Sequence, residues 1–86
     1  MHAAETYGSW TMKNLILQLV MNPKKYKYVL GHYIIKLLPM VNVDGVVIGN
    51  SRNSLVGVDL NRRWSEPNAL LHPEIYFIKL SMLEQS

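Results

Sequence analysis

Two groups of residues in this chain could perform chemistry, and the first lies near the amino terminus. His2 and Glu5 are separated by two alanines. An imidazole nitrogen and a carboxylate oxygen are both good zinc ligands, and a tight turn or the first turn of a helix would aim them at one point. The alternative is that both residues belong to a frayed chain end, because terminal residues are often poorly ordered.

The second group, Arg52, Asn61 and Arg62, lies in a polar stretch over residues 40–68. Guanidinium groups are the preferred partners of carboxylates, and an adjacent Asn amide adds a directional donor, so this group could bind a terminal carboxylate. The alternative is that these arginines and the neighbouring Arg63 are exposed or form weak ion pairs within the chain. The candidate partners for such pairs are Asp44, Asp59 and Glu66.

The helices and strands that would position these groups are predicted from the spacing of apolar residues and from residues, such as proline, that start or stop a helix. Residues 6–21 carry apolar side chains at helical spacing, which predicts a helix that stops before Pro23. A last helix is predicted to begin at Pro73, because proline suits the first helical position. The helix-forming apolar positions are Met12, Ile16, Leu19 and Val20 in the first helix and Ile75, Ile78 and Met82 in the last.

Between the helices, residues 32–38 are rich in β-branched and aromatic types, which predicts a strand covered on both faces. Residues 40–68 follow with little periodicity and a turn signal at Asp44 and Gly45. A loop of this length usually carries function. The order helix, strand, loop, helix is typical of a doubly wound α/β sheet, in which ligands bind at the carboxyl ends of strands.

Composition limits the classes of protein that this chain can represent. Its 86 residues are 49% apolar and 17% charged, which indicates one packed unit and excludes a disordered chain. The absence of cysteine excludes thiolate catalysis and Cys-rich zinc modules. No apolar run is long enough to span a membrane, and no secretory signal is visible, so we expect an intracellular protein without a membrane partner.

Nine basic against six acidic residues give a net charge of +3, which permits an acidic partner. Three lysines lie beside two tyrosines at residues 24–28, and such a cluster could bind nucleic acid. Short lysine runs are more often solvated loops, so we do not expect a nucleic-acid partner. The cluster consists of Lys24, Tyr26, Tyr28, Lys25 and Lys27.

Six motifs occur in order along almost the whole chain, at residues 2–6, 8–10, 39–50, 52, 54–64 and 71–76. Together they resemble the zinc metallocarboxypeptidases, and within them the cytosolic carboxypeptidase branch that trims glutamates from tubulin. The resemblance implies a partial doubly wound α/β fold with a mixed sheet, in which residues 1–86 form part of the catalytic domain and strands are missing on both sides.

The resemblance also implies roles for the two groups of residues. His2 and Glu5 match the first two zinc ligands, and Arg52 matches the catalytic arginine that polarises the scissile carbonyl and stabilises the oxyanion. Asn61 and Arg62 match the pair that binds the C-terminal carboxylate of the substrate. The implied partners are protein or peptide C-terminal tails, glutamylated tubulin among them, and the implied location is the cytoplasm.

The chain departs from the family pattern in several places. Alanines occupy the positions between the first two ligands where the family has Pro-Gly, and Val43 replaces a proline. The family's third zinc ligand and its general base belong to sequence that would follow Ser86, so we expect the isolated chain to bind zinc weakly and to lack peptidase activity. His72 matches a family residue that opens a helix, and we expect it to be structural.

Two other functions stay open at this point. The chain could be a non-catalytic binder of acidic C-terminal tails that uses only Arg52, Asn61 and Arg62. It could also be a small basic protein that binds nucleic acid, which would show salt-sensitive binding.

Overall fold

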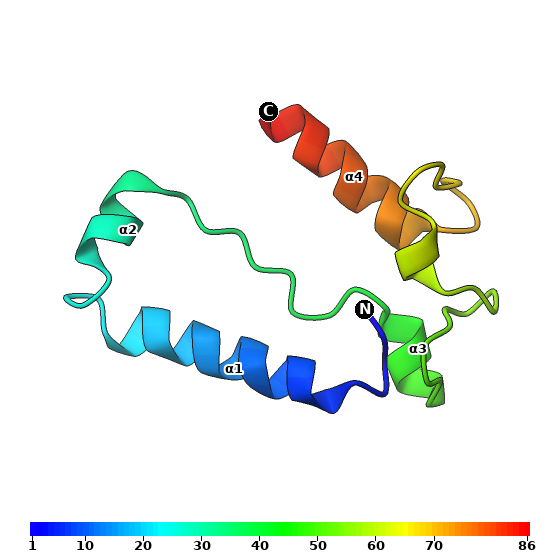
Figure 1. Cartoon of the computed structure of the whole chain (residues 1–86), viewed down its shortest axis with the longest axis horizontal. Helices are drawn as coiled ribbons and strands as arrows, with labels where there is room; N and C mark the ends of the chain where they lie inside the picture. The colour runs from blue at the N-terminus through cyan, green and yellow to red at the C-terminus, as the bar shows by residue number, and fades with distance from the viewer. The chain divides into compact units, whose positions relative to one another are not determined.

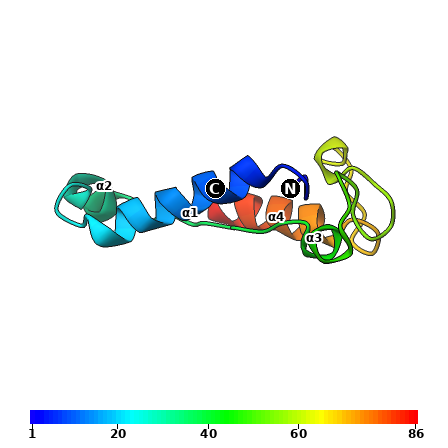
Figure 2. The ribbon, with the colours of Figure 1, turned by 90° about the horizontal axis from the view of Figure 1, so that it is seen from below.

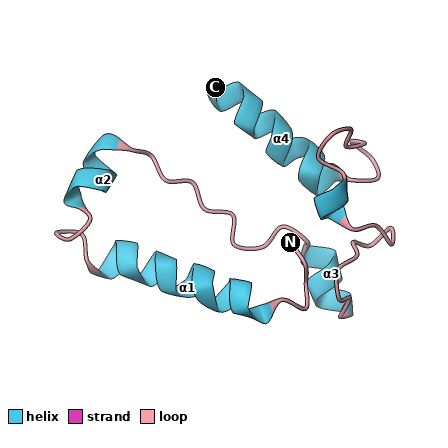
Figure 3. Ribbon diagram, viewed as in Figure 1, coloured by secondary structure: helices cyan, strands magenta, loops and turns pink.

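A computed structural model describes residues 1–86, which form five helical segments and no strand (Figure 1 and Figure 3). The chain falls into two compact units. Unit 1 contains residues 1–5 and 40–86, and unit 2 contains residues 6–39. The segments are α1 (Thr6–Met21) and α2 (Lys27–His32) in unit 2, and α3 (Val43–Ile48), the 3₁₀ helix η1 (Leu60–Arg62) and α4 (Pro73–Gln85) in unit 1.

In unit 2, α1 covers the residues that periodicity predicts, and it ends before Pro23. Met12, Ile16 and Leu19 are half-buried, whereas Val20 at the end of the same predicted face is 68% exposed. The short helix α2 is not foreseen by the sequence analysis. No helix in the structure combines the length and the apolar character needed to cross a membrane.

The strand predicted over residues 32–38 is wrong for this structure. His32 is the last residue of α2, and residues 33–38 form an extended connection without regular structure (Figure 2). Ile34 in the middle of this connection is 90% exposed. A strand needs a neighbour with which to exchange backbone hydrogen bonds, and no second extended segment pairs with this one. The α/β fold class is therefore not confirmed.

In unit 1, α3 occupies part of the stretch that the sequence analysis treats as a loop. Its N-cap is Asn42, whose side-chain oxygen accepts a hydrogen bond from the backbone N–H of Gly45 at 3.0 Å. Gly49 ends the helix with a φ of 79°, a conformation that favours glycine. Asp44 and Gly45 thus lie inside a helix, and their interpretation as a turn is wrong, because the preceding Asn supplies a helix cap.

The Asn42 side chain joins α3 to the loop that follows it. The residue is only 1% exposed, and its amide nitrogen donates to the backbone oxygens of Arg52 at 3.4 Å and Asn53 at 3.0 Å. A Cβ atom placed on Gly45 would overlap this amide, so a larger residue there would displace the Asn42 side chain from its hydrogen bonds. The loop that carries Arg52 is therefore held by a buried side chain.

The apolar core of unit 1 centres on Leu60 of η1 and Ile75 of α4, which are both fully buried. The helix α4 begins at Pro73, as predicted. His72, the residue before it, is 8% exposed, and its Nδ1 accepts a hydrogen bond from the backbone N–H of Asn68 at 3.0 Å. This contact agrees with a structural role for His72 at the start of α4.

Candidate functional site

The turn that precedes α1 brings His2 and Glu5 together. The backbone N–H of Glu5 donates to the carbonyl of His2 at 3.1 Å, and the side chains meet with Nδ1 of His2 3.2 Å from Oε1 of Glu5. The backbone N–H of Ala4 donates to the carbonyl of Ser51 at 2.9 Å. The turn is thereby tied to the loop of Arg52, which gives the chain end a fixed place within unit 1.

Asp59 is the residue that sequence reasoning missed as a member of this site. Its Oδ1 lies 3.0 Å from Nε2 of His2, and the same oxygen accepts the backbone N–H of Asn61 at 3.0 Å, which caps η1. From the sequence alone, Asp59 is a candidate partner only for arginine. A signal was present, because an Asp two residues before Asn61 is suited to cap a helical turn that begins between them.

Asp59 is electrostatically stabilised in its ionised form. The hydrogen bond from His2 lowers the pKa of the Asp59 carboxyl, and partial burial opposes this effect. The hydrogen bond from the Asn61 N–H and the electrostatic interactions with His2 and Arg62 lower the pKa further. An ionised Asp59 can only accept hydrogen bonds, so Nε2 of His2 carries a proton when the two groups are bonded.

This arrangement suits His2 as a metal ligand. Metal-binding histidines commonly donate the N–H of one ring nitrogen to a carboxylate, which orients the ring and leaves the other nitrogen for the metal. In the structure Nε2 faces Asp59, and Nδ1 faces the Glu5 carboxylate. His2 and Glu5 can therefore serve as two zinc donors. No group of three or more His, Asp or Glu side chains is arranged to hold a metal ion.

Arg52 lies in the loop between α3 and η1, and it is exposed. Together with Asn50, Ser51 and Asn53 it lines a surface hollow of about 310 Å³. Its backbone is fixed by Asn42, while its guanidinium forms no ion pair with a carboxylate of the chain. The group is accessible to a ligand, and its loop adjoins the His2 turn through Ser51.

Asn61 and Arg62 belong to η1, and both are exposed. The side-chain oxygen of Asn61 accepts a hydrogen bond from the indole Nε1 of Trp64 at 2.9 Å. Arg62 forms no ion pair, although its charge acts on Asp59. The arginines are therefore exposed, as one form of the alternative states, and none is paired with a carboxylate of the chain. An exposed, unpaired guanidinium is able to bind an anion.

The structure therefore brings three of the candidate residues, together with Asp59, into one hydrogen-bonded chain. Glu5 contacts His2, His2 contacts Asp59, and the backbone N–H of Asn61 donates to Asp59. The loop of Arg52 is joined to the His2 turn by its backbone, because the carbonyl of Ser51 accepts the N–H of Ala4. The Arg52 guanidinium makes no ion pair. His2 thus lies two hydrogen bonds from the backbone N–H of Asn61, and the exposed guanidinium of Arg62 belongs to the next residue.

Comparisons with known proteins show the family to which the chain is related. The model of the zinc carboxypeptidase family matches residues 1–74. Cytosolic carboxypeptidase 1 of Mus musculus is 47% identical over 78 residues, which cover 91% of this chain and 6% of the relative. Cytosolic carboxypeptidase 4 of Homo sapiens is 44% identical over 78 residues, which cover 91% of this chain and 7% of the relative.

A putative zinc carboxypeptidase of Plasmodium falciparum (isolate 3D7) is 40% identical over 82 residues, which cover 94% of this chain and 5% of that protein. The chain therefore spans less than a tenth of the length of these relatives. No solved structure matches it.

Proposed function

Because this chain belongs to the zinc carboxypeptidase family, we propose that it supplies two zinc donors and the carboxylate-binding residues of a carboxypeptidase site. The donors are His2 and Glu5, and the residues that bind the chain end of the substrate are Asn61 and Arg62. Arg52 is the catalytic residue that would face the scissile carbonyl.

The observation that carries this proposal is the position of Asp59. One oxygen of its carboxylate contacts both Nε2 of His2 and the backbone N–H of Asn61. The residues proposed for metal binding and for chain-end binding are 56 or more positions apart in the sequence, yet they share one hydrogen-bond acceptor. A site that removes the last residue of a polypeptide needs its hydrolytic centre and its carboxylate clamp close together.

Each side chain has a separate part in the proposed reaction. A zinc ion held by His2 and Glu5 would supply Lewis acidity and a water of lowered pKa. Arg52 stabilises the negative charge that develops on the carbonyl oxygen, and a fixed donor in that position contributes roughly 3–4 kcal/mol. Asn61 and Arg62 bind the terminal carboxylate, which selects the end of the chain over internal peptide bonds.

The proposed substrates are protein tails that end in glutamate, glutamylated tubulin among them, and the proposed location is the cytoplasm. The net charge of +3 and the unpaired guanidinium groups favour an acidic tail. Two of the relatives are named cytosolic carboxypeptidases. Catalytic zinc takes three protein ligands, and this chain supplies two, so we expect the 86-residue chain to bind tails without cleaving them.

Titration of the labelled chain with a short peptide that ends in glutamate tests the proposal. We expect the backbone amide signals of Asn61 and Arg62 to shift on binding, and Arg62→Ala to weaken binding roughly tenfold. The matched control is Arg63→Ala, which removes the same charge from the next position and is expected to change affinity less than threefold. Equal losses in the two variants would contradict a specific clamp at Arg62.

A second candidate function is favoured by the same exposed guanidinium groups. Since Arg52 and Arg62 have no carboxylate partner within the chain, they could retain acidic tails without metal or catalysis. Capture of a glutamylated peptide that is unchanged by removal of zinc would favour this non-catalytic binder. Capture that strengthens when zinc is added would favour the site of a carboxypeptidase.

A further inference from the structure

The hydrogen bond between Trp64 and Asn61 has a defined donor and a defined acceptor. The indole Nε1 of Trp64 lies 2.9 Å from Oδ1 of Asn61. An indole N–H is only a donor, so the Asn61 amide must turn its oxygen toward Trp64. Its nitrogen then faces away with two N–H donors, and one of the two lone pairs of its oxygen is occupied by the indole. Trp64 therefore turns the NH₂ group of Asn61, which is a donor only, away from the indole.

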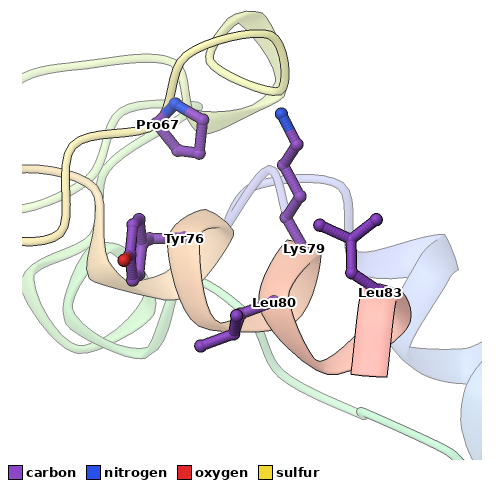
Figure 4. Close-up of a pocket in the computed structure, with 5 residues that line it drawn as sticks. All are labelled: Pro67, Tyr76, Lys79, Leu80 and Leu83. Carbon is purple, nitrogen blue, oxygen red and sulfur yellow. The ribbon is translucent and has the colours of Figure 1, made fainter. Parts of the chain in front are cut away.

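Trp64 is itself held in place by α4. The ammonium of Lys79 donates to the backbone oxygens of Trp64 and Ser65, each at 2.8 Å. Figure 4 shows the Lys79 side chain extending from α4 toward the loop that carries Pro67. The turn after η1 is thus anchored to the last helix, and the indole has a fixed backbone from which to reach Asn61.

The backbone of Asn61 is fixed from the other side. Its N–H donates to Oδ1 of Asp59, the carboxylate that contacts His2. With the backbone held, rotation of the Asn61 amide about the last side-chain bond would exchange its oxygen and nitrogen. The hydrogen bond from Trp64 is the contact that opposes this rotation.

We propose that Trp64 is a specificity-determining positioning residue, which makes the clamp of Asn61 and Arg62 select a free carboxylate over a carboxamide. The inference rests on the proposed function of that clamp. A carboxylate offers two acceptor oxygens to two donor side chains. A carboxamide offers one oxygen, and its NH₂ group meets a donor in either orientation. If Asn61 could rotate, its oxygen would accept the carboxamide NH₂, and the selectivity would fall.

The inference is tested by comparing the affinities of two peptides with the same sequence. Both have glutamate as the last residue, but one ends in a free carboxylate and the other in a carboxamide. For the unaltered chain we expect the carboxylate to bind roughly tenfold more tightly. Trp64→Phe keeps an aromatic ring and removes the indole donor, and we expect the ratio to fall to about threefold or less. Trp10→Phe is the matched control, because Trp10 lies in α1 of unit 2 and is 63% exposed.

The outcomes separate the two levels of the proposal. If the unaltered chain shows no preference, the carboxylate clamp itself is contradicted, and the role of Trp64 with it. If the unaltered chain has the preference and Trp64→Phe weakens both peptides by the same factor, Trp64 only supports the local structure, and this inference alone is overturned.

Asn61→Asp provides an independent variant if Trp64→Phe does not fold. An Asp at this position keeps an acceptor for the Trp64 indole, but it presents an acceptor instead of donors to the ligand. We expect this variant to bind the carboxamide more tightly than the carboxylate. A retained preference for the carboxylate would show that the Asn61 amide is not the selecting donor, and it would overturn the premise on which the role of Trp64 rests.

Discussion

Nε2 of His2 lies 3.0 Å from Oδ1 of Asp59, although the two residues are 57 positions apart in the sequence. Because Oδ1 also accepts the N–H of Asn61, this contact joins the proposed metal-binding turn to the proposed carboxylate clamp. It also fixes the orientation of the imidazole, so that Nδ1 points toward Glu5. The properties of Asp59 should therefore depend on His2.

The first prediction concerns the pKa of Asp59. In the His2→Ala variant we expect this pKa to rise toward the usual value of about 3.9, because the hydrogen bond that lowers it most is removed. His32→Ala is the control, since His32 lies in α2 of unit 2 and contacts Tyr28. Carboxyl ¹³C signals followed from pH 6 to about pH 2 give the value. An unchanged Asp59 pKa in His2→Ala would contradict the contact.

The same lowered pKa sets the pH dependence of stability. A carboxyl whose pKa is lower in the folded state stabilises that state above its unfolded pKa of about 3.9, and the contribution is lost as pH falls through the folded value. We expect the free energy of unfolding of the unaltered chain to fall more steeply below about pH 4 than that of Asp59→Asn. Denaturant titrations of the two proteins at several pH values measure this difference.

A second prediction uses two helical glycines with different surroundings. Gly31→Ala in α2 meets no atom within contact distance, so we expect it to stabilise α2 by about 0.5–1 kcal/mol. Gly45→Ala in α3 places its methyl group on the Asn42 amide, so we expect it to destabilise unit 1. Amide exchange in the two helices measures both effects. If both substitutions changed the stability of their helix in the same direction, the packing of Asn42 beneath Gly45 would be contradicted.

A third prediction concerns Asn42 itself. Asn42→Ala leaves the backbone groups of Gly45, Arg52 and Asn53 without their partner, so we expect a loss of roughly 2 kcal/mol in unit 1. Asn14→Ala in α1 is the control, because Asn14 is exposed and forms no side-chain hydrogen bond, and it should change stability by less than about 0.5 kcal/mol. Amide exchange in the loop of Arg52 is the measurement. Protection that survives in Asn42→Ala would show that the loop does not depend on this side chain.

A fourth prediction concerns zinc. We expect the chain to bind zinc weakly, with no detectable binding in His2→Ala and a roughly tenfold loss in Asp59→Asn, where the group that orients His2 is weakened. His32→Ala should bind as the unaltered chain does. Competition with a zinc indicator measures these affinities. Binding that is insensitive to His2 would place the metal elsewhere in the chain.

The sequence predicts the local features of the fold better than the contacts that depend on other segments. The bounds of α1 and the start of α4 at Pro73 are confirmed, because apolar spacing and proline act within one helix. The strand over residues 32–38 fails, because β-branched residues favour an extended backbone but a strand exists only with a paired neighbour. The sequence does not predict α3, because Asp44 and Gly45 are common turn residues. In the structure the Asn42 side chain caps a helix that contains both residues.

The candidate site shows the same division. The sequence identifies His2, Glu5, Asn61 and Arg62 by residue type and motif, and their roles in binding stay predictions. It does not reveal that Asp59 contacts His2, since a contact across 57 residues depends on how the loop folds back. It also does not reveal the direction of the Asn61 amide, which is set by the donor of Trp64.

The central claim is that the metal-binding turn and the carboxylate clamp act on the same chain end. Its most direct test replaces zinc with paramagnetic Co²⁺ and adds a peptide that ends in glutamate, so that the metal shifts nearby peptide protons. We predict the largest shifts at the last residue of the peptide, decreasing toward its amino end, and their loss in His2→Ala. Equal shifts along the whole peptide, or shifts that persist in His2→Ala, would contradict the claim.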